Sequence, residues 1–126
     1  MRTYIASSFT RRTEALDLAR KLGQRGFDIH ARWLYNDSPG NIGKDMTKWS
    51  LIDYEDASLC DIFIGLIGDE QSFGGRHTEL GIALALEKHI FLIGTREQIF
   101  HWHPKVLLYS SIESFLSDPS IRGYES

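Results

Sequence analysis

A glutamate in a glycine-led helical stretch is the first candidate for chemistry in this sequence. Glu79 lies in residues 74–85, a glycine turn followed by an alanine- and leucine-rich helical pattern, between the apolar runs 61–67 and 89–94. Each run has the length and the β-branched or aromatic content of a buried strand. The stretch therefore predicts strand, loop, helix and strand, with Glu79 in the first turns of the helix. Because ligands of open α/β sheets bind beyond the carboxyl ends of the strands, a carboxylate here can face a ligand.

Composition restricts the class of protein that could carry such a site. The chain has 126 residues, of which 42% are hydrophobic and 25% charged, and these values are typical of one globular domain. A net charge of -3 without a basic run argues against a nucleic-acid polymer as partner. The single cysteine, Cys60, excludes an internal disulfide and fits a reducing compartment. No apolar run approaches the ~20 residues of a membrane span, and the N-terminus has no signal-peptide pattern. We therefore expect a cytoplasmic protein with no membrane partner.

Strand-like and helix-like patterns alternate along the whole chain, with no internal repeat. This alternation predicts a mainly parallel sheet in a single domain over residues 1–126, with helices on both faces. The tail after about residue 118 is expected to be frayed. Besides the elements around Glu79, we expect strands at 3–6, 27–33 and 106–109, helices at 10–25, from Asp45 or Thr47 to 59 and at 111–116, and loops at 36–44 and 95–104.

The order of three residues adds a family resemblance to this pattern. Tyr4 on the first strand, Asp53 ahead of the third strand and Glu79-Leu80-Gly81 on the next helix resemble the nucleoside 2-deoxyribosyltransferase superfamily, including its nucleotide N-glycoside hydrolases. The similarity covers roughly residues 4–109. It implies an α/β, flavodoxin-like (Rossmann-like) five-stranded parallel sheet of order 2-1-3-4-5. It also implies assembly as homodimers or larger sets of dimers, and it calls for no cofactor.

The resemblance also implies roles for these three residues. Cleavage of an N-glycosidic bond passes through an oxocarbenium-like state, as O-glycoside hydrolysis does, and carboxyl groups divide the work. Glu79 would attack the anomeric carbon, Asp53 would handle the proton or bind a sugar hydroxyl, and Tyr4 would orient Glu79 by a hydrogen bond. Attack on the sugar ester by a second nucleobase gives transfer, and attack by water gives hydrolysis.

Each of these residues also has a purely structural interpretation. Glu79 near a helix start suits the helix dipole. Asp53, beside Glu55 and Asp56, fits a solvated helix face, and a strand tyrosine is most often a core residue with a satisfied hydroxyl. The functional interpretation depends on the three residues occurring together and in this order.

Residues that could hold an anion follow the first strand. Backbone amides at a helix N-terminus bind anions, and Ser7, Ser8, Arg11 and Arg12 stand where the helix at 10–25 begins. In the nucleotide-hydrolysing branch the corresponding loop holds a 5′-phosphate, and Ser8 matches its serine while Arg11 or Arg12 supplies the charge. The alternative is that the serines cap the helix and the arginines are solvated.

The turn before Glu79 could complete a phosphate or sugar pocket through Ser72, Gly74 and Gly75. Here the sequence departs from the family. The transferases typically carry an aspartate six residues before the nucleophile, whereas this chain has Phe73. The phosphate-binding hydrolases tend to have a serine there, and Ser72 is one residue away. This departure weakens the assignment as a transferase.

Arginine and histidine side chains near Glu79 are further binding candidates. Arg76 and His77 could bind a phosphate or a carboxylate, or tune Glu79, or they could form a solvent-facing helix start. The resemblance implies that this approximate position supplies a residue to the site of a neighbouring subunit, and His101 or His103 could be that residue. His-x-His also suggests a metal ligand pair, but no other spacing supports a metal site, and we predict none.

Three functions fit these observations. The first, which we favour, is an enzyme that cleaves or transfers the N-glycosidic bond of a nucleoside or nucleoside 5′-monophosphate. The second is a non-catalytic module of the same fold that captures a nucleotide-derived ligand. The third is an unrelated phosphate or cofactor binder of flavodoxin type. The absence of G-x-G-x-x-G and G-x-x-x-x-G-K-[ST] motifs argues against the third.

Overall fold

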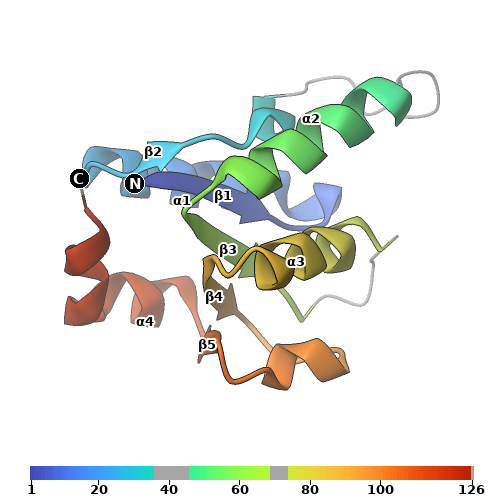
Figure 1. Cartoon of the computed structure of the whole chain (residues 1–126). Coiled ribbons are helices and arrows are strands. Elements are labelled where there is room, and N and C mark those ends of the chain that lie inside the picture. The colour runs from blue at the N-terminus through green and yellow to red at the C-terminus, as the bar shows by residue number, and fades with distance from the viewer. Residues whose placement is uncertain (36–45, 69–73, 126) are drawn as a thin grey trace.

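Five parallel strands form one sheet in the order β2-β1-β3-β4-β5 (Figure 1). The computed structural model describes residues 1–35, 46–68 and 74–125. The order and the parallel pairing confirm the predicted sheet. The strands are β1 (Arg2–Ala6), β2 (Asp28–Ile29), β3 (Ile62–Leu66), β4 (His89–Ile93) and β5 (Val106–Tyr109).

Helices cover both faces of this sheet. On one face α2 (Met46–Leu59) and α3 (Gly75–Ala85) pack against each other, and α1 (Arg12–Gln24) lies on the opposite face (Figure 1). The guanidinium of Arg25, just after α1, donates a hydrogen bond of 2.8 Å to the Leu116 carbonyl in α4 (Ile112–Ser117), which joins α4 to α1. Within the described ranges, no helix has the length and apolar content that crossing a membrane requires.

The centre of the sheet is buried on both faces, as expected for parallel strands between two helical layers. Every residue of β3 is buried, and so are the last four of β4. Beyond these strands the chain runs so close to itself that a Cβ at Gly94 would lie 2.1 Å from the Ile67 carbonyl oxygen. Gly94 also has a positive φ of 131°, so only glycine suits this position. The close approach fixes where the segment after β4 begins.

The second strand is shorter than the predicted span 27–33. Only Asp28–Ile29 pairs with β1, and Arg32–Tyr35 form a 3₁₀ helix, η2. The reason is the Trp33 indole, which donates a hydrogen bond of 2.7 Å to the Ile5 carbonyl of β1. This contact ties residues 32–35 to β1 through a side chain instead of through strand pairing. An alternating pattern of residue types was therefore mistaken for an extended strand.

Other predicted irregular segments are also helical. The predicted loop 95–104 contains the 3₁₀ helix η4 (Ile99–Trp102), while the predicted helix 10–25 begins as a 3₁₀ turn, η1 (Phe9–Arg11), before α1. The tail expected to fray forms η5 (Pro119–Tyr124), because Ile121 is buried and the Tyr124 ring packs against Phe91 at 5.4 Å.

Two predictions for the region before α2 differ in whether the structure tests them. The predicted loop 36–44 and the candidate cap Asp45 lie outside the described residues. Thr47, the other candidate, lies inside α2, which begins at Met46, so it is not the N-cap.

Candidate active site

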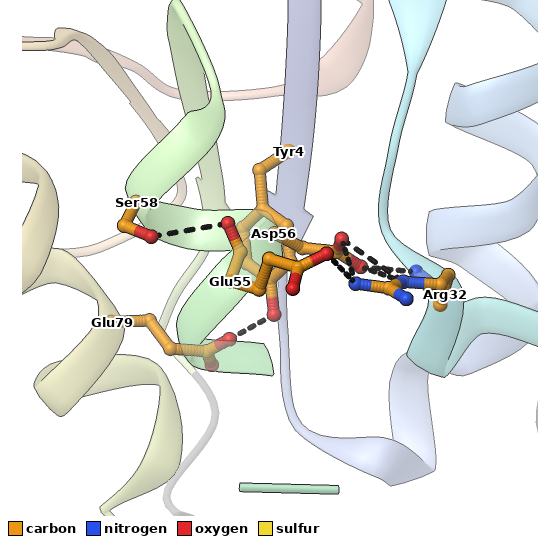
Figure 2. A network of polar contacts seen from close by, with 6 residues as sticks. All are labelled: Tyr4, Arg32, Glu55, Asp56, Ser58 and Glu79. Atoms are coloured by element: carbon orange, nitrogen blue, oxygen red, sulfur yellow. Dashed lines mark hydrogen bonds and ion pairs between the residues drawn. The ribbon is translucent and has the colours of Figure 1, made fainter. Parts of the chain in front are cut away.

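A tyrosine and a glutamate meet between β1 and α3. The Tyr4 hydroxyl donates a hydrogen bond to Oε2 of Glu79, and Figure 2 shows the two side chains pointing toward each other. Tyr4 is fully buried, and Leu80 and Ala83 of α3 are buried as well. Glu79 lies one turn before Ala83, so both are on the side of α3 that faces the sheet, and from there Glu79 reaches β1. The contact that the family resemblance implied is therefore present.

Asp53 joins this pair from α2. It is partly buried, and its Oδ1 atom is buried without a hydrogen-bond partner among the described residues. Its charge raises the pKa of both Tyr4 and Glu79. The three residues predicted from separate parts of the sequence thus interact within one group, although they come from β1, α2 and α3.

Burial dominates the protonation of this group. It raises the pKa of Glu79 to about 8; the Tyr4 hydrogen bond opposes this shift, and the charges of Asp53 and Asp56 add to it. Burial also raises the pKa of Asp53 to about 6, with a further increase from Asp56 and a decrease from Arg32. The pKa of Tyr4 is well above its usual value for the same reason. Near pH 7 the free protein therefore keeps a proton on Glu79 while most Asp53 is ionised.

A buried carboxylate beside Asp53 was not recognised in the sequence. Asp56, one helical turn after Asp53, is 1% exposed. It accepts hydrogen bonds from the Arg32 backbone N–H at 2.9 Å and from the Arg32 guanidinium at 2.9 and 3.1 Å (Figure 2). The same guanidinium reaches Glu55 at the surface at 2.9 Å. The i, i+3 spacing of Asp53 and Asp56 was a signal that both point inward, but Arg32 fell in a predicted strand.

The two serines after β1 lie at its carboxyl end, on the same strand as Tyr4. The Ser7 hydroxyl donates to the Ser8 carbonyl at 2.8 Å, and the Ser8 and Thr10 hydroxyls are 3.0 Å apart. Within the described residues neither serine side chain caps η1 or α1. The interpretation of these serines as helix caps is therefore wrong.

The two arginines of this segment make contacts across the site edge. Arg11 pairs with Glu14 at 2.7 Å and donates to the Ile67 carbonyl beyond β3 at 3.1 Å. Arg12 donates to the Leu34 carbonyl of η2 at 2.7 Å. The alternative that both guanidiniums are only solvated is thus wrong, since they brace the segments that follow β1, β2 and β3.

The glycines that precede Glu79 leave space at the helix start. Gly74, the N-cap of α3, has a φ of 92°, which is the left-handed region. Among the residues that the structure describes, none would come within 4 Å of a Cβ at Gly74 or Gly75. Ser72 and Phe73 lie outside the described residues.

Arg76 points away from Glu79, toward the segment after β4. Its side chain is 3% exposed and pairs with Glu97 at 2.6 Å. The Glu97 backbone N–H donates to His101 Nδ1 at 2.9 Å, and His101 is itself 1% exposed. The expectation that His101 reaches a neighbouring subunit is wrong, because its ring is enclosed in its own chain. Glu97 was missed in the sequence, where nothing distinguished it from a solvated loop residue.

The remaining histidines surround the same region. The His77 and His101 rings are 5.7 Å apart, and His77 Nδ1 lies 3.3 Å from the Gln98 amide nitrogen. His103 accepts a hydrogen bond from the Lys105 backbone at 3.1 Å. His77 and His103 are half-buried, whereas His101 is buried. In the described parts of the chain, no three His, Cys, Asp or Glu side chains are grouped so that they could hold a metal ion.

A small cavity lies beneath the first turns of α3. Its volume is about 10 Å³, and its lining includes Arg76, His77, Leu80 and His101. This is about the space that one water molecule needs, whereas small-molecule pockets are typically ~300 Å³ or larger. The cavity is therefore too small to be the binding pocket for a nucleoside.

Two solved structures share this architecture over nearly the whole chain. A CMP N-glycosidase of Clostridium botulinum matches with a TM-score of 0.65 and 24% identity, over 92% of this chain and 95% of its own. A 2-deoxyribosyltransferase from Bacillus psychrosaccharolyticus matches with a TM-score of 0.67 and 21% identity, over 97% of this chain and 96% of its own. No protein-family model and no curated protein sequence matches. At these identities the likeness establishes a common fold, which is the fold that the family resemblance implied.

Proposed function

We propose that this protein cleaves or transfers the N-glycosidic bond of a nucleoside or nucleoside 5′-monophosphate through a covalent glycosyl-Glu79 intermediate. The observation that carries the proposal is the hydrogen bond from the buried Tyr4 hydroxyl to Glu79, with Asp53 in the same electrostatic group. A hydroxyl partner alone would also suit a structural glutamate, but a second carboxyl group nearby disfavours the charge of Glu79 and is not needed for structure. The two enzymes of the same fold, an N-glycosidase and a deoxyribosyltransferase, support this choice of chemistry.

In the first step, a carboxylate oxygen of Glu79 forms a bond to the anomeric carbon of the sugar. The bond between this carbon and the base nitrogen breaks, and its electron pair leaves with the base, which takes up a proton from Asp53 or a neighbouring donor. Tyr4 holds Oε2 of Glu79, so Oε1 is the oxygen that we expect to attack. The product is a sugar ester of Glu79 and a free base.

In the second step, water or a second base attacks the anomeric carbon of the ester. The bond to the Glu79 oxygen breaks, and the carboxylate is regenerated together with a free sugar or a new nucleoside. The incoming nucleophile loses a proton, which Asp53 or a neighbouring base accepts.

The role of Asp53 depends on its protonation. With a pKa of about 6 it is mostly ionised near pH 7 in the free protein, which suits a carboxylate that accepts a hydrogen bond from a sugar hydroxyl. As the proton donor it would be active in only a minority of molecules. These two roles predict different pH profiles of kcat/KM. A sugar-binding Asp53 gives a rise up to about pH 8, as Glu79 ionises, followed by a plateau. A donating Asp53 gives a maximum near pH 7, and Asp53→Asn would remove the falling limb.

A 5′-phosphate on the substrate is the second part of the proposal. Ser8, Arg11 and Arg12 lie at the carboxyl end of β1, the strand that carries Tyr4. One arginine bonded to a phosphate is worth roughly 1.5–3 kcal/mol per charge-assisted hydrogen bond, or about ten- to a hundredfold in binding. We therefore expect monophosphates to be cleaved with a higher kcat/KM than their nucleosides. We expect Arg11→Ala or Arg12→Ala to reduce that preference.

A non-catalytic binding module is the second candidate function. The observation that favours it is the pKa of about 8 at Glu79, which leaves few ionised nucleophiles at neutral pH. Such a module would bind a nucleotide without releasing its base.

Base release from a panel of nucleosides and 5′-monophosphates, measured between pH 6 and pH 9, tests the proposal. Glu79→Gln should lower turnover by several orders of magnitude because an amide does not form the ester. Glu87→Gln, which removes a surface carboxylate just after α3, is the matched control and should behave as wild type. Binding without base release would favour the binding module, and full activity of Glu79→Gln would remove Glu79 from its role. Mass spectrometry with a slow 2-fluoro-sugar substrate should locate the adduct on the Glu79 peptide.

A further inference from the structure

The first turn of α3 is joined to the segment after β4 by a buried ion pair. From this contact we infer that Arg76 and Glu97 are positioning residues, which hold the start of α3 so that Glu79 faces the substrate correctly. The inference rests on the proposed function, because it assigns a role to the helix that carries the nucleophile. It concerns residues that do not contact the reacting atoms.

Within the described residues, the start of α3 has no side-chain cap and no acidic residue in its first turn. Its N-cap is Gly74, which has no side chain to accept a hydrogen bond. The backbone N–H groups of His77 and Thr78 both donate to the Gly74 carbonyl, at 3.1 and 3.0 Å, and the Thr78 hydroxyl donates to the same oxygen at 3.2 Å. A helix start of this kind frays easily unless tertiary contacts hold it.

Arg76 supplies such a contact from within this turn. Its guanidinium lies 2.6 Å from Glu97 Oε2, and the two side chains are 3% and 18% exposed. Water screens an ion pair with so little exposure only weakly, and removal of one partner leaves an uncompensated charge in the protein interior. The pair therefore fixes the first turn of α3 relative to the segment after β4, which carries Glu97.

Glu97 lies on a segment that is itself fixed. Its backbone N–H donates to Nδ1 of the buried His101 at 2.9 Å. The next residue, Gln98, accepts a hydrogen bond of 2.8 Å from the Phe100 backbone at the start of η4 and lies 3.3 Å from His77 on α3. The close passage at Gly94 anchors the beginning of this segment. Arg76 thus binds to a rigid acceptor.

This arrangement holds the nucleophile helix at two points. Arg76 and Glu79 are three residues apart, about one turn of α3, and Arg76 binds beyond β4 while Glu79 contacts Tyr4 on β1. If the first pair is lost, the Tyr4 contact alone must set the position of Glu79. A displacement of ~1 Å at a reacting group costs on the order of a hundredfold in rate.

The kinetic test uses paired variants on the substrate that wild type cleaves fastest. Arg76→Met should lower kcat about 10- to 100-fold with little change in KM. Glu97→Gln, which keeps an oxygen acceptor, should have a smaller effect in the same direction, and Arg76→Lys should restore part of the loss. The matched control is Glu87→Gln, which breaks the exposed 2.9 Å pair between Glu87 and Lys105 just after α3. It should leave kcat unchanged.

A second measurement does not depend on activity. Amide hydrogen exchange of His77 and Thr78 should be at least about tenfold faster in Arg76→Met and Glu97→Gln, while exchange in β1 and β4 stays at the wild-type rate. If no protein in the set cleaves any substrate but these amides still exchange faster, the proposed function fails and the anchoring of α3 stands. Unchanged exchange at both amides, an equal increase throughout the sheet, or an unchanged kcat in Arg76→Met would overturn the inference.

Discussion

At the scale of single residues, the Tyr4 hydroxyl decides how Glu79 presents its carboxyl group. The hydroxyl comes from a fully buried strand residue, so it cannot move away from Oε2 without disturbing the core. Its hydrogen bond favours the ionised carboxylate and opposes the burial that raises the pKa of Glu79. Tyr4 therefore has two effects, on orientation and on charge, and both can be measured.

Tyr4→Phe removes the hydroxyl and keeps the ring in the core. Loss of one hydrogen bond to a charged group is worth roughly 1.5–3 kcal/mol, so we expect kcat/KM to fall about ten- to a hundredfold. The pKa of Glu79 should rise further above about 8, which would move the rising limb of the pH–rate profile to higher pH. Tyr109→Phe is the control, since the Tyr109 hydroxyl also donates to a carboxylate, that of Asp118, outside the candidate site. A Tyr4→Phe profile identical to that of Tyr109→Phe would contradict this role.

Stability should also depend on the proton of Glu79. Its pKa is about 8 in the folded protein, above the ordinary value of 4.5, so the folded state holds a proton that the unfolded state releases between these values. Stability from this group is complete below about pH 4.5 and is lost as the pH rises toward 8. In urea unfolding at pH 5, 6.5 and 8, wild type should lose stability more steeply than Glu79→Gln. Parallel curves for the two proteins would refute the raised pKa.

At the scale of elements, α2 contributes Asp53 to the site, and the ion pair of Asp56 with Arg32 attaches α2 to η2. The Arg32 guanidinium contacts both Asp56, which is buried, and Glu55, which is exposed. One arginine on η2 thus binds two adjacent carboxylates in different surroundings, which gives a direct comparison between a buried and a surface pair.

Asp56→Asn should be much more damaging than Glu55→Gln. Asp56→Asn weakens the hydrogen bonds between a buried carboxylate and the Arg32 guanidinium, which costs roughly 1–3 kcal/mol of unfolding free energy, while an exposed pair such as Arg32–Glu55 is worth about 0–1 kcal/mol. The charge of Asp56 also raises the pKa of Asp53 and Glu79, so both pKa values should fall in Asp56→Asn. Urea unfolding and the pH–rate profile measure the two effects. Equal unfolding free energies for both variants would show that Asp56 does not fasten α2.

Much of the element order was predictable because apolar runs of strand length are separated by helical patterns. Glu79, Asp53 and Tyr4 were identified through the family resemblance that their types and order along these elements carry. The Asp56–Arg32 and Arg76–Glu97 pairs were not, because each joins residues at least twenty positions apart, whose partner is set by the packing of η2 and of the segment after β4. The η2 turn itself depends on a single tertiary hydrogen bond, from Trp33 to Ile5, that no local pattern encodes.

At the scale of the whole molecule, η4 carries an exposed apolar group. Ile99, Phe100 and Trp102 are 78%, 55% and 61% exposed, and the Arg96 guanidinium lies over the Trp102 ring. Three large apolar side chains exposed on one short helix are typical of an interface. Because His101 is enclosed within its own chain, such an interface would use these three side chains rather than that histidine.

We therefore predict a homodimer or a higher homo-oligomer in solution. Light scattering at micromolar concentration should give at least twice the mass of the chain. The double variant Phe100→Ser with Trp102→Ser should shift this toward the monomer, because it removes most of the apolar area of the patch. Leu51→Ser with Tyr54→Ser, a change of two similarly exposed residues on α2, serves as the control. A monomeric wild type with activity retained would contradict the prediction.

The separation of Tyr4 and Glu79 along the chain has a consequence for folding. These two residues are 75 positions apart, and their contact joins α3 to β1, which also pairs with β3. No fragment that ends before Glu79 contains the site in any form. Contacts between residues so distant in sequence form slowly, because a long loop must close first. During refolding, catalytic activity should consequently return only with the last-formed native contacts, and it would report the completed fold rather than any partly folded state.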